Sequence, residues 1–406
     1  MNNMIVFHHN DLDGRAAGFI AALFLDMFEK YADEYLYREI DCCNGSSKLE
    51  LKPDCRLKQI NYNIYDQIVS NVEPGEIVFF VDLTFTDATA YILDELKTLN
   101  CNIIWIDHHK SSIDLEESHP EYKDIKGIRS IDRSGAWLTW EWFANPINQA
   151  EADIDYYSKI NMFYTTITQG CPIHPEKTSL IPKTITEKSP IPLFVRLTDD
   201  YDRWIHAFKE SKSFNLAHMM YGSSPLCGFW YHLFLEYLST EMNLTSIRCD
   251  ECQTSDNDEF VNNVERYLDT LKLKSDSPLG SALSKGDIML SYDLKTKRTQ
   301  WYSGGFEGYL TDGTNTYRAA ILNIRSNSDC FPDEIIDEYD LVSIYAFNGG
   351  ETSVGKFKYS FYTNKDNVDC NAIAQYYSPS GGGHASAAGC YSDEFIYEDY
   401  GPINKD

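Results

Sequence analysis

Short apolar runs alternate with helix-like stretches over the first 110 residues. The runs Met4–Phe7, Ile77–Val81 and Ile103–Ile106 contain only apolar side chains, as do strands that are buried on both faces of a sheet. Between them, apolar positions recur with helical spacing in Arg15–Tyr31 and Thr86–Leu99. Buried strands separated by helices predict an α/β fold, with a parallel sheet that is covered on both faces.

The remainder of the chain predicts three further regions. Residues 134–170 and most of residues 205–272 have helical periodicity, whereas Cys171–Pro192 contains five prolines and is expected to be a loop or insertion. Beyond residue 286 we expect the strands Ile288–Tyr292, Tyr317–Asn323, Leu341–Phe347 and Phe357–Tyr362, followed by the helix Asn371–Tyr377. The expected domains are an α/β domain over residues 1–205 with an insertion near 171–192, a helical connector over 206–280, and a smaller α/β domain over 281–406.

The composition narrows the class of protein. Among 406 residues, 35 are Lys or Arg and 62 are Asp or Glu, which gives a net charge of −27. This charge disfavours long duplex nucleic acid as a partner, because phosphate chains would meet repulsion outside any local groove. No run is apolar enough to span a membrane and no secretory signal is evident, so we expect a cytoplasmic, soluble protein without a membrane partner. The eleven cysteines, including Cys42-Cys43 and Cys249-x-x-Cys252, are expected to be reduced thiols.

Four acidic and histidine-containing clusters each follow an apolar run. They are His8 to Gly14, Asp82, Asp107-His108-His109 and Asp199 to Asp202. Because the carboxyl ends of parallel strands meet at one edge of a sheet, we expect these side chains to converge. Carboxylates mixed with imidazoles suit Mn²⁺ or Mg²⁺, and two cations about 3.5–4 Å apart would neutralise so many acids. Such a pair predicts phosphoryl chemistry, in which a metal-bridging hydroxide attacks phosphorus.

The order of these motifs resembles the DHH superfamily of phosphoesterases, which is named after its Asp-His-His motif. The superfamily includes RecJ-type exonucleases, nanoRNases, cyclic-dinucleotide phosphodiesterases and family II pyrophosphatases, and the resemblance implies two metals, usually Mn²⁺. It implies a catalytic pair, Asp107 and His109, in which His109 contacts the scissile phosphate or acts as an acid. The implied metal ligands are His9, Asp11, Asp13, Asp82 as the bridge, His108 and Asp200, with His8 and Asp199 as alternates. Asp200 is preferred because Asp200-Tyr-Asp202-Arg-Trp204 resembles an Asp-x-Asp-x-Trp motif of one branch.

A glycine run near the C-terminus carries a second resemblance. The segment from Gly381 to Gly389, Gly-Gly-Gly-His-Ala-Ser-Ala-Ala-Gly, is similar to the signature of the DHH-associated C-terminal domain. The resemblance implies an active site in a cleft between two lobes and disfavours the pyrophosphatase branch. The implied substrate-binding residues are Gly381, Gly382, Gly383, His384 and Ser386.

These observations predict a metal-dependent phosphodiesterase that hydrolyses short oligonucleotides or small nucleotide phosphoesters with two Mn²⁺ ions, Mg²⁺ being possible. One alternative is a RecJ-like exonuclease on single-stranded DNA, which would need a basic groove lined with aromatic side chains. An alternative of another class is a non-catalytic nucleotide-binding protein. Intact carboxylates in all four clusters favour the enzyme over the binding protein.

Overall fold

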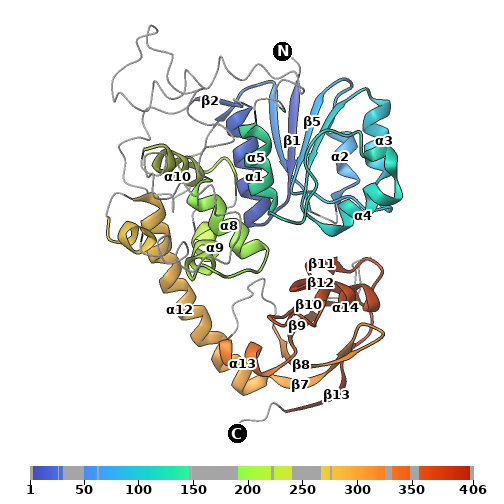
Figure 1. Cartoon of the computed structure of the whole chain (residues 1–406), viewed down its shortest axis with the longest axis vertical. Coiled ribbons are helices and arrows are strands. Elements are labelled where there is room, and N and C mark those ends of the chain that lie inside the picture. Colours follow the sequence, from blue (N-terminus) through green and yellow to red (C-terminus); the bar gives the residue numbers. More distant parts are fainter. Residues whose placement is uncertain are drawn as a thin grey trace. The chain divides into compact units, whose positions relative to one another are not determined.

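The computed structural model divides the chain into two compact units, Met1–Gly286 and Asp287–Asp406, which we describe separately (Figure 1). The structure describes residues 3–25, 27–30, 50–61, 64–145, 148, 191–220, 224–239, 267–274, 277–324, 332–347 and 356–402.

The first unit is built on a four-stranded parallel sheet, which confirms the expected α/β fold. The strand order is β4-β1-β5-β6, and every pair in it is parallel. The strands are β1 (Met4–His8), β4 (Cys55–Gln59), β5 (Ile77–Val81) and β6 (Asn102–Ile106). Strand β4 is not predicted by the apolar pattern, because it is an edge strand whose Arg and Lys side chains interrupt that pattern.

Alternating side chains of the central strands enter two separate cores. Val6 and Phe79 face one core together with α1 (Leu12–Phe24) and α5 (Gly135–Ala144). Phe7, Phe80 and Trp105 face the other core, on the side of the helices α2 (Gln67–Ser70), α3 (Tyr91–Thr98) and α4 (Lys110–Ser118) (Figure 1). A short helical turn, Pro120–Tyr122, follows α4. Both faces of the sheet are therefore covered, as the fully apolar strands predict.

Three further helices pack in the core that contains α1. They are α8 (Leu193–Asp202), α9 (Glu210–Met220) and α10 (Gly228–Ser239). Helix α8 contacts both α1 and α5, so it lies beside the helix that carries Asp13. These contacts matter for the site, because α8 carries the fourth acidic cluster.

Two predicted helices have the wrong bounds. The helix predicted over Arg15–Tyr31 ends at Phe24, and Phe28–Lys30 forms a strand, β2, that pairs with β3 (Glu50–Leu51). The helix predicted over Thr86–Leu99 begins at Tyr91, because residues 86–90 first form a turn closed on the carbonyl of Thr86. In both cases apolar side chains at helical spacing are buried by a turn or strand instead.

The second unit contains a seven-stranded mixed sheet of order β11-β12-β10-β9-β8-β7-β13. Its strands are β7 (Phe306–Thr311), β8 (Thr316–Asn323), β9 (Leu341–Phe347), β10 (Phe357–Tyr362), β11 (Gly382–Gly383), β12 (Ala387–Ser392) and β13 (Glu398–Pro402), with helices α13 (Asp333–Glu338) and α14 (Cys370–Tyr377). The predicted strands over 317–323, 341–347 and 357–362 and the predicted helix over 371–377 are all present.

The strand predicted over Ile288–Tyr292 is wrong. These residues lie inside a 27-residue helix, α12 (Pro278–Gly304), within which the division between the two units falls. Ile288 and Tyr292 are 73% and 75% exposed, so no core selects the extended conformation that their side chains favour locally. The domain bounds given above remain a prediction.

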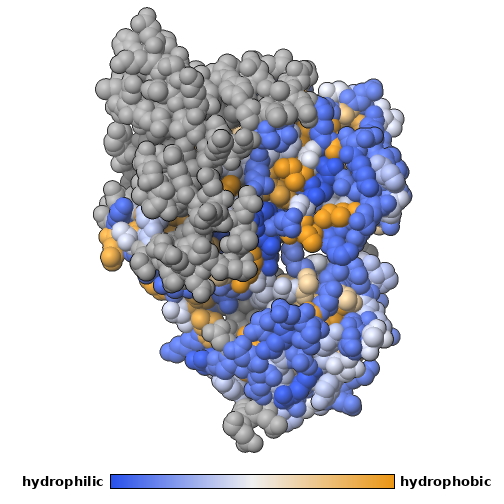
Figure 2. All heavy atoms as spheres, in the orientation of Figure 1, coloured by the Kyte–Doolittle hydropathy of each residue, from blue (hydrophilic) through white to orange (hydrophobic). Residues whose placement is uncertain are grey.

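Several sequence features lie outside the described residues: Cys42-Cys43, the Cys249-x-x-Cys252 pair, residues 149–170 of the predicted helical region and nearly all of the proline-rich segment. The described cysteines that are free thiols are Cys55, Cys101, Cys227, Cys370 and Cys390. Within the described ranges, no helix has both the length and the apolar character that crossing a membrane requires. On the face drawn in Figure 2, hydrophilic residues predominate over the described part of the chain.

Candidate metal centre

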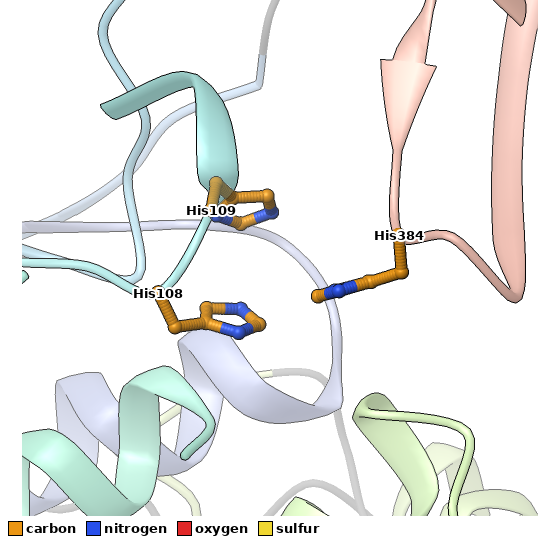
Figure 3. A group of neighbouring side chains, drawn as sticks. All are labelled: His108, His109 and His384. Carbon is orange, nitrogen blue, oxygen red and sulfur yellow. The ribbon is translucent and has the colours of Figure 1, made fainter. Parts of the chain in front are cut away.

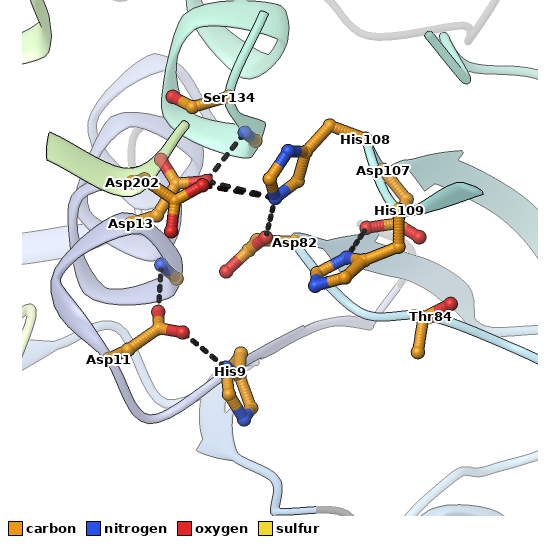
Figure 4. A network of polar contacts seen from close by, with 12 residues as sticks. His9, Asp11, Asp13, Asp82, Thr84, Asp107, His108, His109, Ser134 and Asp202 are labelled. Carbon is orange, nitrogen blue, oxygen red and sulfur yellow. Dashed lines mark hydrogen bonds and ion pairs between the residues drawn. The ribbon is translucent and has the colours of Figure 1, made fainter. Parts of the chain in front are cut away.

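Acidic and imidazole side chains from four segments of the first unit converge at one edge of its parallel sheet (Figure 4). Asp11 caps the N-terminus of α1, Asp13 lies in the first turn of that helix, and Asp82 follows β5. The Asp107-His108-His109 motif follows β6, and Asp202 is the last residue of α8. The topology of a parallel sheet therefore assembles residues that are up to two hundred positions apart, as the sequence predicts.

One group of candidate ligands contains His9, Asp11 and Asp82, whose ligand atoms lie within 4.8 Å of one another. Asp11 is the N-cap of α1: one carboxylate oxygen accepts the N–H of Gly14 at 2.8 Å, and the other is 2.6 Å from Nδ1 of His9. Burial alone would raise the pKa of Asp11, but the attraction of His9 and these hydrogen bonds hold it well below its usual range. Asp11 is therefore a carboxylate at neutral pH, as a metal ligand must be.

Asp82 is the most informative residue of the site. It is 1% exposed, and neither of its carboxylate oxygens accepts a hydrogen bond from any described residue. Nε2 of His108 lies 3.1 Å from Oδ1 of Asp82. Burial, followed by the charges of Asp13 and Asp11, raises the pKa of Asp82 well above its ordinary value. A buried carboxylate among other carboxylates is costly unless a cation is bound, so these oxygens fit a metal site.

The backbone at Asp82 is also unusual. Its φ of 53° lies in the left-handed region, which a non-glycine residue adopts at a cost. The neighbouring helix α5 approaches through Gly135, where an added Cβ would lie 2.6 Å from Cβ of Asp82 and 3.0 Å from Oδ2 of Asp13. Only glycine at position 135 allows the two carboxylates and the helix to be this close.

A second group of candidate ligands contains Asp13, His108 and Asp202. Nε2 of His108 is 3.6 Å from Asp13 and 3.4 Å from Asp202, in addition to its contact with Asp82. Asp13 also accepts the N–H groups of Gly135 at 2.6 Å and Ala136 at 2.8 Å, which open helix α5. Burial and the charge of Asp11 nevertheless raise the pKa of Asp13 to about 7. The contact between Asp82 of the first group and His108 of the second connects the two groups of candidate ligands.

Asp107 and His109 form a hydrogen-bonded pair beside these two groups. The ring centroids of His108 and His109 lie 4.5 Å apart, and Figure 3 shows the two rings next to each other. Asp107 is fully buried; Oδ1 is 2.8 Å from Nδ1 of His109, and Oδ2 accepts the hydroxyl of Ser112. Burial would lower the pKa of His109, but the charge and hydrogen bond of Asp107 raise it above its ordinary value. His109 is thus held with a proton on Nδ1 and is the residue of this site best suited to carry a second proton.

In the fourth cluster the structure brings Asp202, and not the predicted Asp200, close to the other candidate ligands. The carboxylate of Asp200 accepts the N–H groups of Ala207 at 2.8 Å and Phe208 at 3.2 Å, so it organises the chain after α8. The first alternate, Asp199, accepts the N–H of Ser134 at 2.6 Å. Neither belongs to a group of candidate ligands among the described residues.

Helical geometry explains why Asp200 and Asp202 lie on different sides of α8. Successive residues of an α-helix are 100° apart, so positions 200 and 202 face nearly opposite directions. Leu193, Leu197 and Asp200 are spaced i, i+4, i+7 and form one buried face of α8. This spacing in the sequence is a signal that Asp200 points into the core and that Asp202 lies on the other side of the helix.

The structure also separates the two histidines of the first cluster. His9 lies with Asp11 and Asp82, whereas the His8 ring packs on α1 at Gly18, where an added Cβ would be 2.9 Å from it. Burial lowers the pKa of His8 to about 4, and its Nδ1 is 2.7 Å from the carbonyl of His9. His9 is therefore the better candidate ligand.

The glycine run of the second unit forms a tight hairpin. Gly382–Gly383 pairs with β12, and His384 and Ala387 exchange backbone hydrogen bonds across the turn. Gly383 has a φ of 148°, and an added Cβ would lie 2.6 Å from the carbonyl oxygen of Ala387. His384, also labelled in Figure 3, belongs to this hairpin. Substrate binding by Gly381, Gly382, Gly383, His384 and Ser386 remains a prediction.

Comparison with solved structures finds DHH-domain proteins that match nearly the whole chain. A DHH domain from a member of a family of ribosomal proteins matches at 12% identity and a TM-score of 0.42, covering 98% of this chain and 83% of that one. An exopolyphosphatase-related protein from Bacteroides fragilis matches at 13% identity and a TM-score of 0.37, covering 97% and 86%. RecJ from Thermus thermophilus in complex with Mn²⁺ matches at 12% identity and a TM-score of 0.34, covering 96% of this chain and 49% of that one.

No protein-family model and no curated protein matches the sequence. The similarity to DHH-domain proteins that the motifs predict is thus found among solved structures. At these identities and TM-scores the likeness concerns the fold, and the functional proposal rests on the residues of the site.

Proposed function

We propose that this chain is a divalent-metal-dependent phosphodiesterase that hydrolyses short oligonucleotides or small nucleotide phosphoesters. The observation that carries this proposal is Asp82, a buried carboxylate whose oxygens accept no hydrogen bond among the described residues and which lies between two groups of candidate ligands. A carboxylate that served only to stabilise the fold would instead be satisfied by N–H or O–H donors, as Asp200 is.

The residues fit two cations better than one. His9 and Asp11 would hold one ion and Asp13, His108 and Asp202 the other, with Asp82 between them. Oxygen ligands with a minority of imidazoles suit Mn²⁺, with Mg²⁺ as the alternative. When bound, such ions supply Lewis-acid chemistry, because they neutralise phosphoryl oxygens and activate water.

His109 is proposed to move a proton in this reaction. Asp107 accepts the Nδ1–H, so the imidazolium carries its transferable proton on Nε2. That proton can be donated to a phosphoryl oxygen or to the leaving alkoxide, and Asp107 then keeps the neutral ring in one orientation. Asp107 is held in turn by Ser112, whose hydroxyl also lies 2.7 Å from that of Thr84.

The small substrate is proposed from charge and from the glycine hairpin. A net charge of −27 opposes a long polyanion, whereas one or two phosphates can be neutralised locally by the cations. We propose that Gly381–Gly383, His384 and Ser386 bind the substrate, because backbone N–H groups beside glycines and an imidazole can approach a phosphate closely.

A hydrolysis screen tests this function. Purified protein is incubated with Mn²⁺ or with EDTA and offered pApA, 3′-phosphoadenosine 5′-phosphate, cyclic dinucleotides and a long single DNA strand, with the Asp82→Asn variant as the matched control. We expect Mn²⁺-dependent turnover of one or more small substrates and none by the variant. Processive degradation of the long strand would instead identify an exonuclease, and absence of any turnover by the Mn²⁺-loaded protein would refute the proposal.

A further inference from the structure

Arg15 is a cation held by neutral side chains rather than by an acid. It lies in the first turn of α1 and is partly buried, and no described carboxylate lies within ion-pair distance of it. Its guanidinium donates from Nη2 to Oδ1 of Asn10 at 2.7 Å, and its Nη1 is 3.0 Å from Nε2 of His218. By contrast, several arginines of the chain pair with an acid: Arg56 with Glu76, Arg129 with Glu116, Arg203 with Asp199, Arg298 with Glu334 and Arg318 with Glu307.

Both groups that hold Arg15 are neutral. Asn10 presents its amide oxygen, and His218 is buried, with Nδ1 2.5 Å from the carbonyl oxygen of Asn215. That contact places the proton of His218 on Nδ1 and leaves the Nε2 lone pair as the acceptor for Arg15. The two contacts therefore fix the guanidinium between α1 and α9 without neutralising its charge.

Arg15 lies close in the chain to Asp11, a candidate ligand of the metal centre. Its backbone N–H donates to the carbonyl of Asp11 at 3.1 Å, and Asn10, which holds its side chain, directly precedes Asp11. Asp11 forms no close ion pair with the Arg15 guanidinium, and its two carboxylate oxygens contact the N–H of Gly14 and Nδ1 of His9. An oriented cation thus lies next to a candidate metal ligand; the charge of Asp11 attracts it, but no described carboxylate forms an ion pair with it.

A phosphate group would supply the negative charge and the acceptor oxygens that the Arg15 guanidinium does not find among its neighbours. A guanidinium carries five N–H donors, of which Asn10 and His218 engage two. The Nε–H is buried without an acceptor among the described residues, which shows that the local fold does not saturate the side chain. The fork of N–H groups matches two oxygens of a phosphate, and charge-assisted hydrogen bonds of this kind are strong.

We propose that Arg15 is a substrate-binding residue that holds a phosphate of a nucleotide beside the Asp and His groups of the metal centre. Asn10 and His218 are positioning residues, since they aim the guanidinium and leave its charge for the ligand. This inference rests on the proposed function for the identity of the ligand as a nucleotide. It adds to that function a cation supplied by the protein that distinguishes phosphate-bearing substrates from neutral ones.

The test measures AMP binding to the Mn²⁺-loaded full chain by titration calorimetry. For Arg15→Gln we expect the Kd for AMP to rise about tenfold or more, because charge-assisted hydrogen bonds are lost, and for Arg15→Lys a smaller rise. Arg298→Gln, at an exposed arginine paired with Glu334 in the second unit, should bind AMP as the wild type does. Binding of Mn²⁺ alone should be unchanged in all of these variants.

The assignment of Arg15 would be overturned if the wild-type protein bound no AMP, or if Arg15→Gln protein bound AMP with an unchanged Kd. Loss of Mn²⁺ binding in both Arg15 variants would also overturn it, because Arg15 would then be a structural residue. Failure of the proposed function is distinguishable. If AMP binding depends on Arg15 but no phosphodiester is hydrolysed, the assignment of Arg15 stands and the protein is a nucleotide binder.

Discussion

The pair Asp202→Asn and Asp200→Asn distinguishes a proposed metal ligand from a structural carboxylate on the same helix. Asp202 faces His108 at 3.4 Å, and burial together with the charges of Asp13 and Asp11 raises its pKa well above the ordinary value. Replacing it removes a repelled charge from the metal-free protein, so the free energy of unfolding in EDTA should be unchanged or higher. Loss of an outer-shell partner commonly costs 10–100-fold in metal affinity, so loss of a direct ligand should cost about 100-fold or more.

Asp200→Asn should have the opposite profile. Asp200 accepts two backbone N–H groups, at 2.8 and 3.2 Å, and an amide offers only one oxygen to them. One buried N–H then loses its acceptor, which costs about 1–3 kcal/mol of the free energy of unfolding. Mn²⁺ affinity should stay within a few-fold of the wild type, because the side chain does not face the candidate ligands.

The assays are Mn²⁺ titration calorimetry on metal-free protein and urea unfolding in EDTA, applied to both variants. Weakened Mn²⁺ binding with unaltered stability in Asp200→Asn, and the reverse in Asp202→Asn, would refute the reasoning and restore the ligand predicted from the motif.

Three further predictions concern protonation and packing at the site. Because the pKa of Asp13 is raised to about 7, Asp13 must lose its proton when a cation binds. The rise in Tm on adding Mn²⁺ should therefore be larger at pH 8 than at pH 6, and an equal rise at both pH values would contradict this. His109→Gln should lower kcat by about 10²–10⁴-fold through loss of the transferable proton while Mn²⁺ binding persists, and turnover at the wild-type rate would remove His109 from the mechanism. Gly135→Ala places a Cβ 2.6 Å from Cβ of Asp82, so the substitution should lower the free energy of unfolding by about 1–3 kcal/mol and weaken Mn²⁺ binding. Unfolding and titration curves that match the wild type would show that α5 can move away.

Much of the fold and the edge on which the site lies follow from short-range pattern. Ile77–Val81 and Ile103–Ile106 have no polar side chain, which fixes them as buried strands, and parallel strands bring whatever follows them to one edge. Asp82 and the Asp107-His108-His109 motif could therefore be placed together without any long-range information.

The remainder depends on contacts that pattern does not encode. The phase of α8 decides between Asp200 and Asp202, and it becomes visible only when Leu193 and Leu197 are counted together with the acids on the same helix. The extent of α12 is another example, because Ile288 and Tyr292 favour a strand locally and are exposed on a long helix instead. The orientation of the Arg15 guanidinium depends on His218, which is 203 residues away in the sequence.

The most direct test of the metal centre is the number and coupling of bound Mn²⁺ ions. Metal-free protein is loaded with Mn²⁺, the ions per chain are counted by elemental analysis, and electron paramagnetic resonance reports whether they interact. We expect two ions per chain with an exchange-coupled spectrum, and loss of that coupling in Asp82→Asn. No tightly bound Mn²⁺, a single isolated ion, or a coupled pair that persists in Asp82→Asn would contradict a site in which this carboxylate lies between two cations.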